Sequence, residues 1–150
     1  MDKVEIKISK YFEGKTIKEF LKENNVGRGK IENIRVNKSS LVNNYYKPLE
    51  TILNENDLLS FIIDEEIDFL CDDDSLNVVY EDEYLLIVDK PINMIIHPDD
   101  KSKGNTLVNL VANYYKKNNI NRKVRFIHRI DKETTGLIIF AKDFISEARL

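Results

Sequence analysis

The beginning of the chain alternates between strand-like and helical patterns of apolar positions. Every second residue from Val4 to Ile8 is apolar, which predicts a strand with one buried face. Thr16 and Glu19 have the spacing of a capping box, and the apolar residues after them recur at helical intervals, which predicts a helix over 17–24. Further along, the pattern predicts a helix over 28–34, a turn-rich segment over 37–46 and a strand over 58–63.

From residue 77 onward, the pattern predicts the start of a sheet together with helices. Short apolar runs separated by polar turns indicate strands over 78–80, 85–88, 94–96, 124–127 and 137–141. Asn105 or Thr106 begins a helix whose apolar face contains Leu107, Leu110, Val111 and Tyr114. The final residues, 144–150, have the pattern of the first turns of another helix. We therefore expect the α+β fold class.

An acidic segment separates two mildly basic regions. Residues 1–63 contain 11 Lys and Arg against 9 Asp and Glu, residues 64–83 contain none against 10, and residues 84–150 contain 12 against 7. The acidic residues lack the ligand spacing, central glycine and distant glutamate of an EF-hand calcium loop. We interpret 64–75 as a solvated linker between a domain over 1–63 and a domain over 76–150. Either basic region permits contact with RNA or DNA without establishing it.

The remaining composition narrows the class of protein. Cys71 is the single cysteine among 150 residues, so an intrachain disulfide and a zinc ribbon are both excluded. No apolar run approaches the roughly 18 residues that a membrane span requires, and the N-terminus has no apolar targeting segment. We therefore expect a soluble, cytoplasmic protein.

The segment over 124–143 presents polar residues between two apolar strands. Its centre reads HRIDKETTG, which brings His128, Arg129 and Asp131 into a polar turn on a rigid scaffold. The positive charges of Arg129 and Lys132 favour the ionised form of Asp131, and an ionised carboxylate can attack carbon or accept a proton. The alternative is that Asp131 and the threonines after it only bind the backbone donors of the turn.

The same residues are a poor match to three other chemistries. A protein kinase would have HRD without the intervening Ile130, together with a glycine-rich loop and a DFG element, and is excluded. Asp131 and Glu133 are too close in sequence to be assigned as the two carboxyls of a glycosidase. His97 and His128 have no evident third ligand, so we expect no metal site.

The segment HRIDKETTGLIIFAK, residues 128–142, resembles the central motif of the RluA-type family of RNA pseudouridine synthases, whose usual form is close to HRLDxxTSGLLLFAK. Ile130 and Thr135 are mild departures from that form. Upstream, VVYEDEYLLIVDKPINMIIHP resembles the entry strands of the family, and TLVNLV resembles its next helix. The resemblance implies that residues 76–150 are the first part of a mainly antiparallel catalytic sheet domain.

The N-terminal region is similar to the alpha-L RNA-binding domain that many of these enzymes carry. GKTIKEFLKENNVGRGKI matches its two-helix opening, whereas RVNKSS stands where the usual turn reads VTVNGK. Arg28, Lys30, Arg35 and Lys38 would then form a phosphate-facing cluster, and an ordinary solvated helix face is the alternative.

The resemblance implies an isomerase that converts specific uridines to pseudouridine in structured RNA, in a ribosomal or transfer RNA stem-loop, with neither cofactor nor metal. Asp131 would be the catalytic aspartate. Because the target must leave the helical stack, Arg129 would fill the space it vacates. The other substrate-binding residues on the motif would be His128, Thr134 and Thr135.

The family's catalytic domain continues well beyond this motif and supplies a stacking tyrosine and a basic partner for the aspartate. We therefore expect the chain to be a fragment that is inactive alone. The alternative is a non-catalytic RNA-binding module. In either case we expect a monomer.

Overall fold

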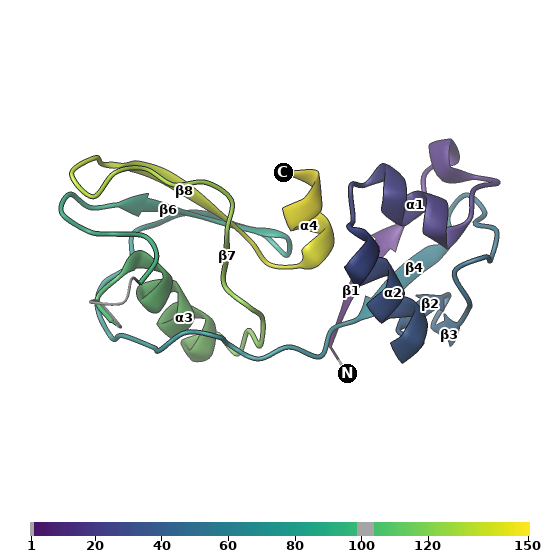
Figure 1. The fold of residues 1–150 in the computed structure, drawn as a ribbon, viewed down its shortest axis with the longest axis horizontal. Coiled ribbons are helices and arrows are strands. Elements are labelled where there is room, and N and C mark those ends of the chain that lie inside the picture. The colour runs from purple at the N-terminus through teal and green to yellow at the C-terminus, as the bar shows by residue number, and fades with distance from the viewer. Residues whose placement is uncertain (1, 99–103) are drawn as a thin grey trace. The chain divides into compact units, whose positions relative to one another are not determined.

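The computed structural model describes residues 2–98 and 104–150, and the chain divides into two compact units. The first unit ends at Asp64, and the second begins at Glu65. Each unit combines helices with a four-stranded sheet in which all neighbouring strands are antiparallel (Figure 1). This confirms the expected α+β class.

The first unit joins a four-stranded sheet to two short α-helices. Its elements are β1 (Lys3–Lys7), the 3₁₀ helix η1 (Lys10–Phe12), α1 (Ile17–Glu23), α2 (Arg28–Asn37), β2 (Ser40–Val42), β3 (Tyr45–Tyr46) and β4 (Leu58–Ile62), with strand order β1-β4-β2-β3. The predicted capping box is present, because Thr16 Oγ1 accepts a hydrogen bond from the Glu19 backbone N at 3.0 Å. Phe20, Leu59 and Phe61 are fully buried in the apolar core of this unit.

The segment expected to be turn-rich, 37–46, contains the hairpin of β2 and β3. Asn43 and Asn44 form its two-residue turn with φ angles of 52° and 70°. Asparagine tolerates this left-handed conformation, which suits the twist of a tight hairpin. Helix α2 also runs three residues further than expected and ends at Asn37, and the residue that caps it, Lys38, has a φ of 51°. The prediction missed the hairpin because its strands are too short to show a period.

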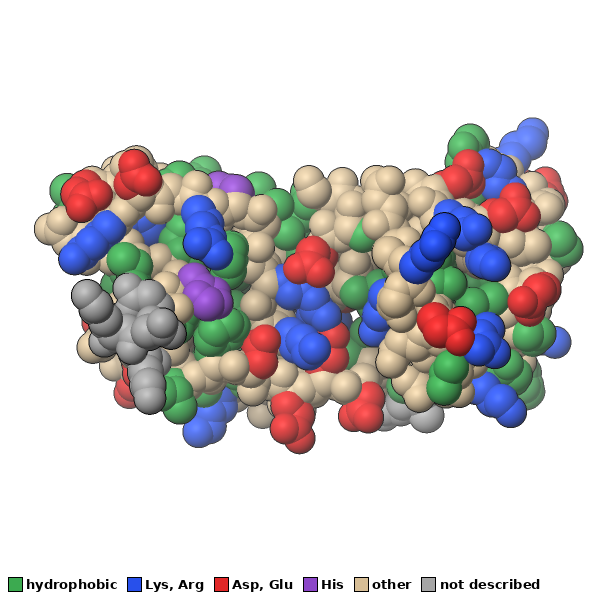
Figure 2. Space-filling view, viewed as in Figure 1, with side chains coloured by type: hydrophobic (Ala, Val, Ile, Leu, Met, Phe, Trp, Pro, Cys, Tyr) green, Lys and Arg blue, Asp and Glu red, His purple; other side chains and the backbone are tan. Residues whose placement is uncertain are grey.

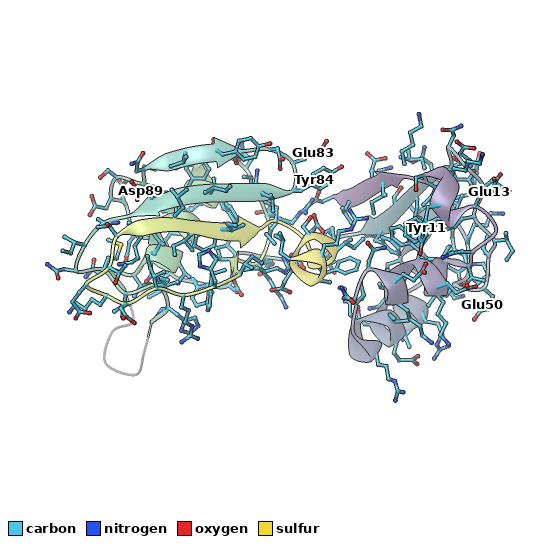
Figure 3. The ribbon with its side chains drawn as sticks, turned by 90° about the horizontal axis from the view of Figure 1, so that it is seen from above. Tyr11, Glu13, Glu50, Glu83, Tyr84 and Asp89 are labelled. Carbon is cyan, nitrogen blue, oxygen red and sulfur yellow. The ribbon has the colours of Figure 1, made fainter. Side chains whose placement is uncertain are left out.

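The second unit packs a helix on one face of its sheet. Its elements are β5 (Val78–Glu81), β6 (Leu85–Lys90), α3 (Leu107–Lys117), β7 (Arg125–Phe126), β8 (Gly136–Ala141) and α4 (Phe144–Arg149), with strand order β5-β6-β8-β7. Strands β6 and β8 pair along their whole length, from Leu85 opposite Ala141 to Lys90 opposite Gly136. Figure 3 shows Tyr84 and Asp89 near opposite ends of β6. Alternate residues of β6 and β8 and one face of α3 form the buried core.

One expected strand of the second unit is absent, and the buried face of α3 is wider than expected. Residues 94–96 are not a strand, because the carbonyl oxygens of Ile95 and Ile96 accept hydrogen bonds from the backbone N of Leu107 and Val108, at 2.9 and 3.0 Å. These carbonyls therefore satisfy the free donors at the start of α3 instead of pairing with a strand. On α3, Tyr114 packs against the core as expected and is half-buried, and Tyr115, which was not expected there, is fully buried.

The expected solvated linker differs from what the structure has at 65–72. Ile67, Phe69 and Cys71 are half-buried and pack against the core of the second unit. Glu65 forms an ion pair with Arg125, and Asp68 Oδ1 accepts a hydrogen bond from the Val124 backbone N at 2.9 Å. Ile67, Phe69 and Cys71 follow a strand-like period of two, but Leu70 interrupts the alternation and the surrounding acidic residues concealed it.

Tyr114 and Lys142 converge on the Glu81 carboxylate. The Tyr114 hydroxyl donates to Glu81 Oε1 at 2.5 Å, and Lys142 Nζ donates to Glu81 Oε2 at 2.7 Å. The hydrogen bond to a carboxylate, helped by partial burial, raises the pKa of Tyr114 from 10.0 to about 12. Because the protonated phenol is the form favoured by folding, this contribution to stability is complete below pH 10 and is lost as the pH rises towards 12.

We expect Tyr114→Phe to remove one phenolate step, near pH 12, from the ultraviolet titration of the folded chain. Glu81→Gln keeps the phenol but removes the carboxylate, so it should move that step back towards pH 10. Identical titration curves above pH 10 for all three proteins would contradict this account.

Candidate active site at the turn before strand β8

The predicted site residues lie on one exposed turn between β7 and β8. Ile127 continues the pairing of β7, since its backbone N donates to the Ile139 carbonyl at 3.0 Å. The turn then closes where the Thr134 backbone N donates to the Asp131 carbonyl at 3.0 Å. All five predicted site residues are exposed on this turn: His128, Arg129, Asp131, Thr134 and Thr135. The structure thus holds these five residues between two paired strands.

Lys90, at the end of β6, holds this turn in place through hydrogen bonds. It is almost fully buried, with 1% exposure, and its Nζ donates to the carbonyl oxygens of Lys132 at 3.1 Å, Met94 at 2.8 Å and Pro91 at 3.1 Å. Burial lowers the pKa of Lys90, and the negative charges of Glu133 and Asp131 oppose that shift. One ammonium group therefore ties the end of β6 to the turn that carries Asp131.

Lys90 was not among the site residues predicted from the sequence, although a signal was present. Leu86 and Val88 face the core, and Lys90 is the next residue at the same two-residue period. A lysine at an inward position of a buried strand needs partners for its charge. That requirement identifies Lys90 as a residue with a specific structural or functional task.

Gly136 marks the change from the turn to β8. Its φ is +150°, a conformation that side chains rarely adopt. A Cβ at this position would lie 3.5 Å from Ile130 Cδ1, which is an ordinary contact. The requirement for glycine is therefore conformational rather than a matter of space.

We expect Gly136→Ala to lower the free energy of unfolding by about 1–3 kcal/mol, because alanine is strained at this φ. Chemical denaturation of the 150-residue chain measures the change. Gly29→Ala is a suitable control, since Gly29 lies inside α2 with open space around it and alanine favours helix there. If both variants were stabilised, the strain assigned to Gly136 would be ruled out.

A cavity of about 470 Å³ opens beside the turn. It is lined by Ser75, Leu76, Asn77, Asp89, Lys90, Pro91, Leu107, Leu110, Thr135 and Gly136. Thr135 thus faces this cavity, whereas Asp131 is not part of its lining. The Asp131 side chain lies on the solvent-exposed part of the turn, where a large substrate has access to it.

The four basic residues predicted to form one cluster in the first unit are exposed or half-buried, but they do not share one face. On α2, Arg28 and Arg35 are separated by about 20° around the axis, whereas Lys30 is about 200° from Arg28. Arg35 also forms an ion pair with Glu32, and Lys38 Nζ lies 5.9 Å from the Tyr46 ring centroid. Figure 2 shows acidic side chains among the basic ones on the visible face of this unit. The RNA-binding role of these four residues stays a prediction, with Lys30 on the other side of α2 from Arg28 and Arg35.

Residues 2–98 and 104–150 form neither a metal site nor a membrane span. Within these ranges, no group of three His, Cys, Asp or Glu side chains is arranged to hold a metal ion. The His97 Nδ1 lies 2.7 Å from the Pro98 carbonyl oxygen. In the same part of the chain, no helix has the length and apolar character needed to cross a membrane.

Comparison with known proteins identifies both units. Residues 84–150 match the family model for RNA pseudouridylate synthase, and residues 4–59 match the model for the N-terminal domain of the ribosomal pseudouridine synthase RluD. The first match includes the whole turn from His128 to Thr135, and the second includes both helices of the first unit.

Individual relatives agree with these matches. Ribosomal large subunit pseudouridine synthase D from Salmonella typhimurium is 35% identical over 126 residues, which cover 82% of this chain and 39% of that protein. The Escherichia coli protein of the same name is 35% identical over 105 residues, or 69% of this chain and 32% of that protein. RNA pseudouridine synthase YhcT from Bacillus subtilis is 40% identical over 75 residues, which cover 50% of this chain and 25% of that protein. The chain therefore spans at most about two fifths of these relatives, and it belongs to the RluA-type family of RNA pseudouridine synthases.

Proposed function

We propose that the protein converts uridine to pseudouridine in structured RNA, with Asp131 as the catalytic nucleophile or base. The observation that carries this proposal is the position of Asp131 within the matched family region, on an exposed turn that Lys90 fixes to the sheet. A carboxylate held on a rigid scaffold and open to solvent can reach a nucleotide that has left its helix.

The reaction is an isomerisation, so it needs no external oxidant, reductant or group donor. The bond between N1 of uracil and C1′ of ribose breaks, and a bond between C5 and C1′ forms. The proton on C5 is released to solvent, and N1 gains a proton. Asp131 acts either by attacking C1′ or by removing a proton from the sugar, and neither role draws on a cofactor or a metal.

The neighbours of Asp131 hold the RNA. Arg129 occupies the space that the target base vacates, because a guanidinium can stack on bases and donate hydrogen bonds at the same time. His128, Thr134 and Thr135 are exposed on the same turn and supply polar contacts to the nucleotide. Substrate binding and chemistry are thus assigned to eight consecutive residues of one turn.

The first unit contributes RNA affinity. Arg28 and Arg35 face one side of α2, and Lys38 lies at its C-terminal end, where these residues contact phosphates. Lys30 would meet the RNA from the other side of the helix. Because two matched relatives are named for the large ribosomal subunit, we propose a ribosomal RNA stem-loop as the substrate, with a transfer RNA loop as the second choice. We place the protein in the cytoplasm as a monomer.

The release of tritium from RNA labelled at C5 of uridine tests the function. We expect the full-length gene product to release it from ribosomal RNA, and we expect the 150-residue chain alone to bind RNA without releasing it. RNA binding without release by the full-length product would overturn the isomerase proposal in favour of an RNA-binding module. Binding that weakens steeply with salt would be the signature of phosphate contacts in either case.

A further inference from the structure

Arg129 lies against an aromatic ring that the sheet holds in place. Its guanidinium carbon is 5.2 Å from the centroid of the Phe126 ring. The Phe126 ring is in turn 5.6 Å from the His97 ring, and the His97 ring is 5.4 Å from the Phe69 ring, both in edge-on arrangements. These four side chains form a row, which we call the aromatic row, beside the turn that carries Asp131.

Phe126 is the fixed member of this contact. It belongs to β7, where it pairs with Phe140 of β8, and its half-buried side chain packs against the apolar core. Arg129, three residues later, is exposed. Within the described part of the chain, no acidic side chain forms an ion pair with Arg129. Among the described residues, the ring of Phe126 is therefore the contact that restrains this arginine.

A restrained arginine suits a residue that must enter a base stack. A free guanidinium on a long side chain loses rotational freedom when it inserts, and that loss weakens the bound state. A ring against the guanidinium removes much of this freedom before RNA binds, and the exposed remainder of the group is available to a nucleobase.

We propose that Phe126 is a positioning residue that holds the Arg129 guanidinium ready to replace the target uridine in the stack. In the complex, Arg129 lies between the Phe126 ring and the base that was the neighbour of the target. This inference rests on the proposed function, in which Arg129 contacts the RNA. Phe126 itself touches neither the reacting atoms nor the aspartate.

The test compares variants that keep or remove the ring. Phe126→Leu removes it but keeps apolar volume, and Phe126→Tyr keeps it. Phe69→Leu is the matched control, because Phe69 is at the far end of the aromatic row and contacts His97 rather than Arg129. Each is made in the full-length gene product, and single-turnover conversion of uridine is measured with saturating RNA, alongside fluorescence of a 2-aminopurine placed next to the target.

We expect Phe126→Leu to slow conversion and base flipping by roughly 5- to 30-fold, the range for a desolvated cation–π contact. Phe126→Tyr and Phe69→Leu should stay within about 2-fold of the unaltered protein, on the same grounds. In an Arg129→Ala background, Phe126→Leu should cause no further loss, because the contact is already gone.

The opposite results separate this inference from the proposed function. Equal losses in Phe126→Leu and Phe69→Leu, or an undiminished loss in the Arg129→Ala background, would overturn the positioning role while the isomerase assignment stood. Full activity of Arg129→Ala would overturn the insertion role of Arg129 and, with it, that of Phe126. No conversion by the unaltered protein would overturn the function itself and everything that rests on it.

A measurement without RNA covers the case in which Phe126→Leu folds poorly. In the 150-residue chain, the Nε proton of Arg129 should show a ring-current shift in its nuclear magnetic resonance signal, because the guanidinium lies over the Phe126 ring. The shift should persist in Phe126→Tyr and disappear in Phe126→Leu. A signal that is identical in all three proteins would show that the ring does not hold the arginine, and it would overturn the proposal.

Discussion

Asp131→Asn in the full-length gene product is expected to abolish pseudouridine formation, with a loss of roughly 10⁴-fold or more in the rate of tritium release. The amide has nearly the shape of the carboxylate, but it can neither attack C1′ nor take up a proton. The fold of the turn should survive, because the hydrogen bond that closes it uses the backbone carbonyl of Asp131 and not its side chain. The variant should therefore bind RNA as well as the unaltered protein does.

Glu133→Gln is the matched control for Asp131→Asn. Glu133 is an exposed carboxylate two residues away on the same turn, so its removal changes the local charge by the same amount. We expect it to keep most of the activity. If Glu133→Gln lost as much activity as Asp131→Asn, general electrostatics of the turn would explain the effect. If Asp131→Asn retained activity, the assignment of the catalytic group would be wrong.

The helices and strands could be predicted wherever the periodic spacing of apolar residues extends over enough positions. The capping box of α1, the strands β4, β6 and β8, and helix α3 were all found from their apolar spacing. The hairpin of β2 and β3 was missed because its two strands have only three and two residues. The linker predicted over 64–75 gives charge more weight than the apolar residues Ile67, Phe69 and Cys71, which pack on the second unit.

For the candidate site too, the sequence predicts the residues that are close together along the chain but not the contacts between distant ones. His128, Arg129 and Asp131 are neighbours in the sequence, so their presence on one turn could be predicted without knowing how the chain folds. The support from Lys90 joins positions 42 residues apart, and the ring of Phe126 meets His97 across 29 residues. Contacts of this kind depend on the pairing of β6, β7 and β8, which no local pattern specifies.

Lys90→Met is expected to lower the free energy of unfolding by about 2–4 kcal/mol, because it leaves three carbonyl oxygens without their shared donor. Methionine keeps the length of the side chain and its apolar packing, so the change isolates the ammonium group. Denaturant unfolding of the 150-residue chain measures the loss. In the full-length gene product, we also expect slower conversion of uridine, since the Lys132 carbonyl is no longer held and the turn that carries Asp131 gains freedom.

The lowered pKa of Lys90 also makes the effect of Lys90→Met on the free energy of unfolding depend on pH. The folded pKa of Lys90 lies below 10.5, so over the interval between the two values the unfolded chain binds more protons than the folded one. The unaltered protein should therefore gain stability relative to Lys90→Met as the pH rises through that interval to 10.5. Lys132→Met, at an exposed neighbour, should change the free energy of unfolding by no more than about 0.5 kcal/mol at any pH. A Lys90→Met protein as stable as the unaltered one would mean that water replaces the ammonium at all three carbonyls, and the turn would then owe its position to the pairing of β6 with β8 alone.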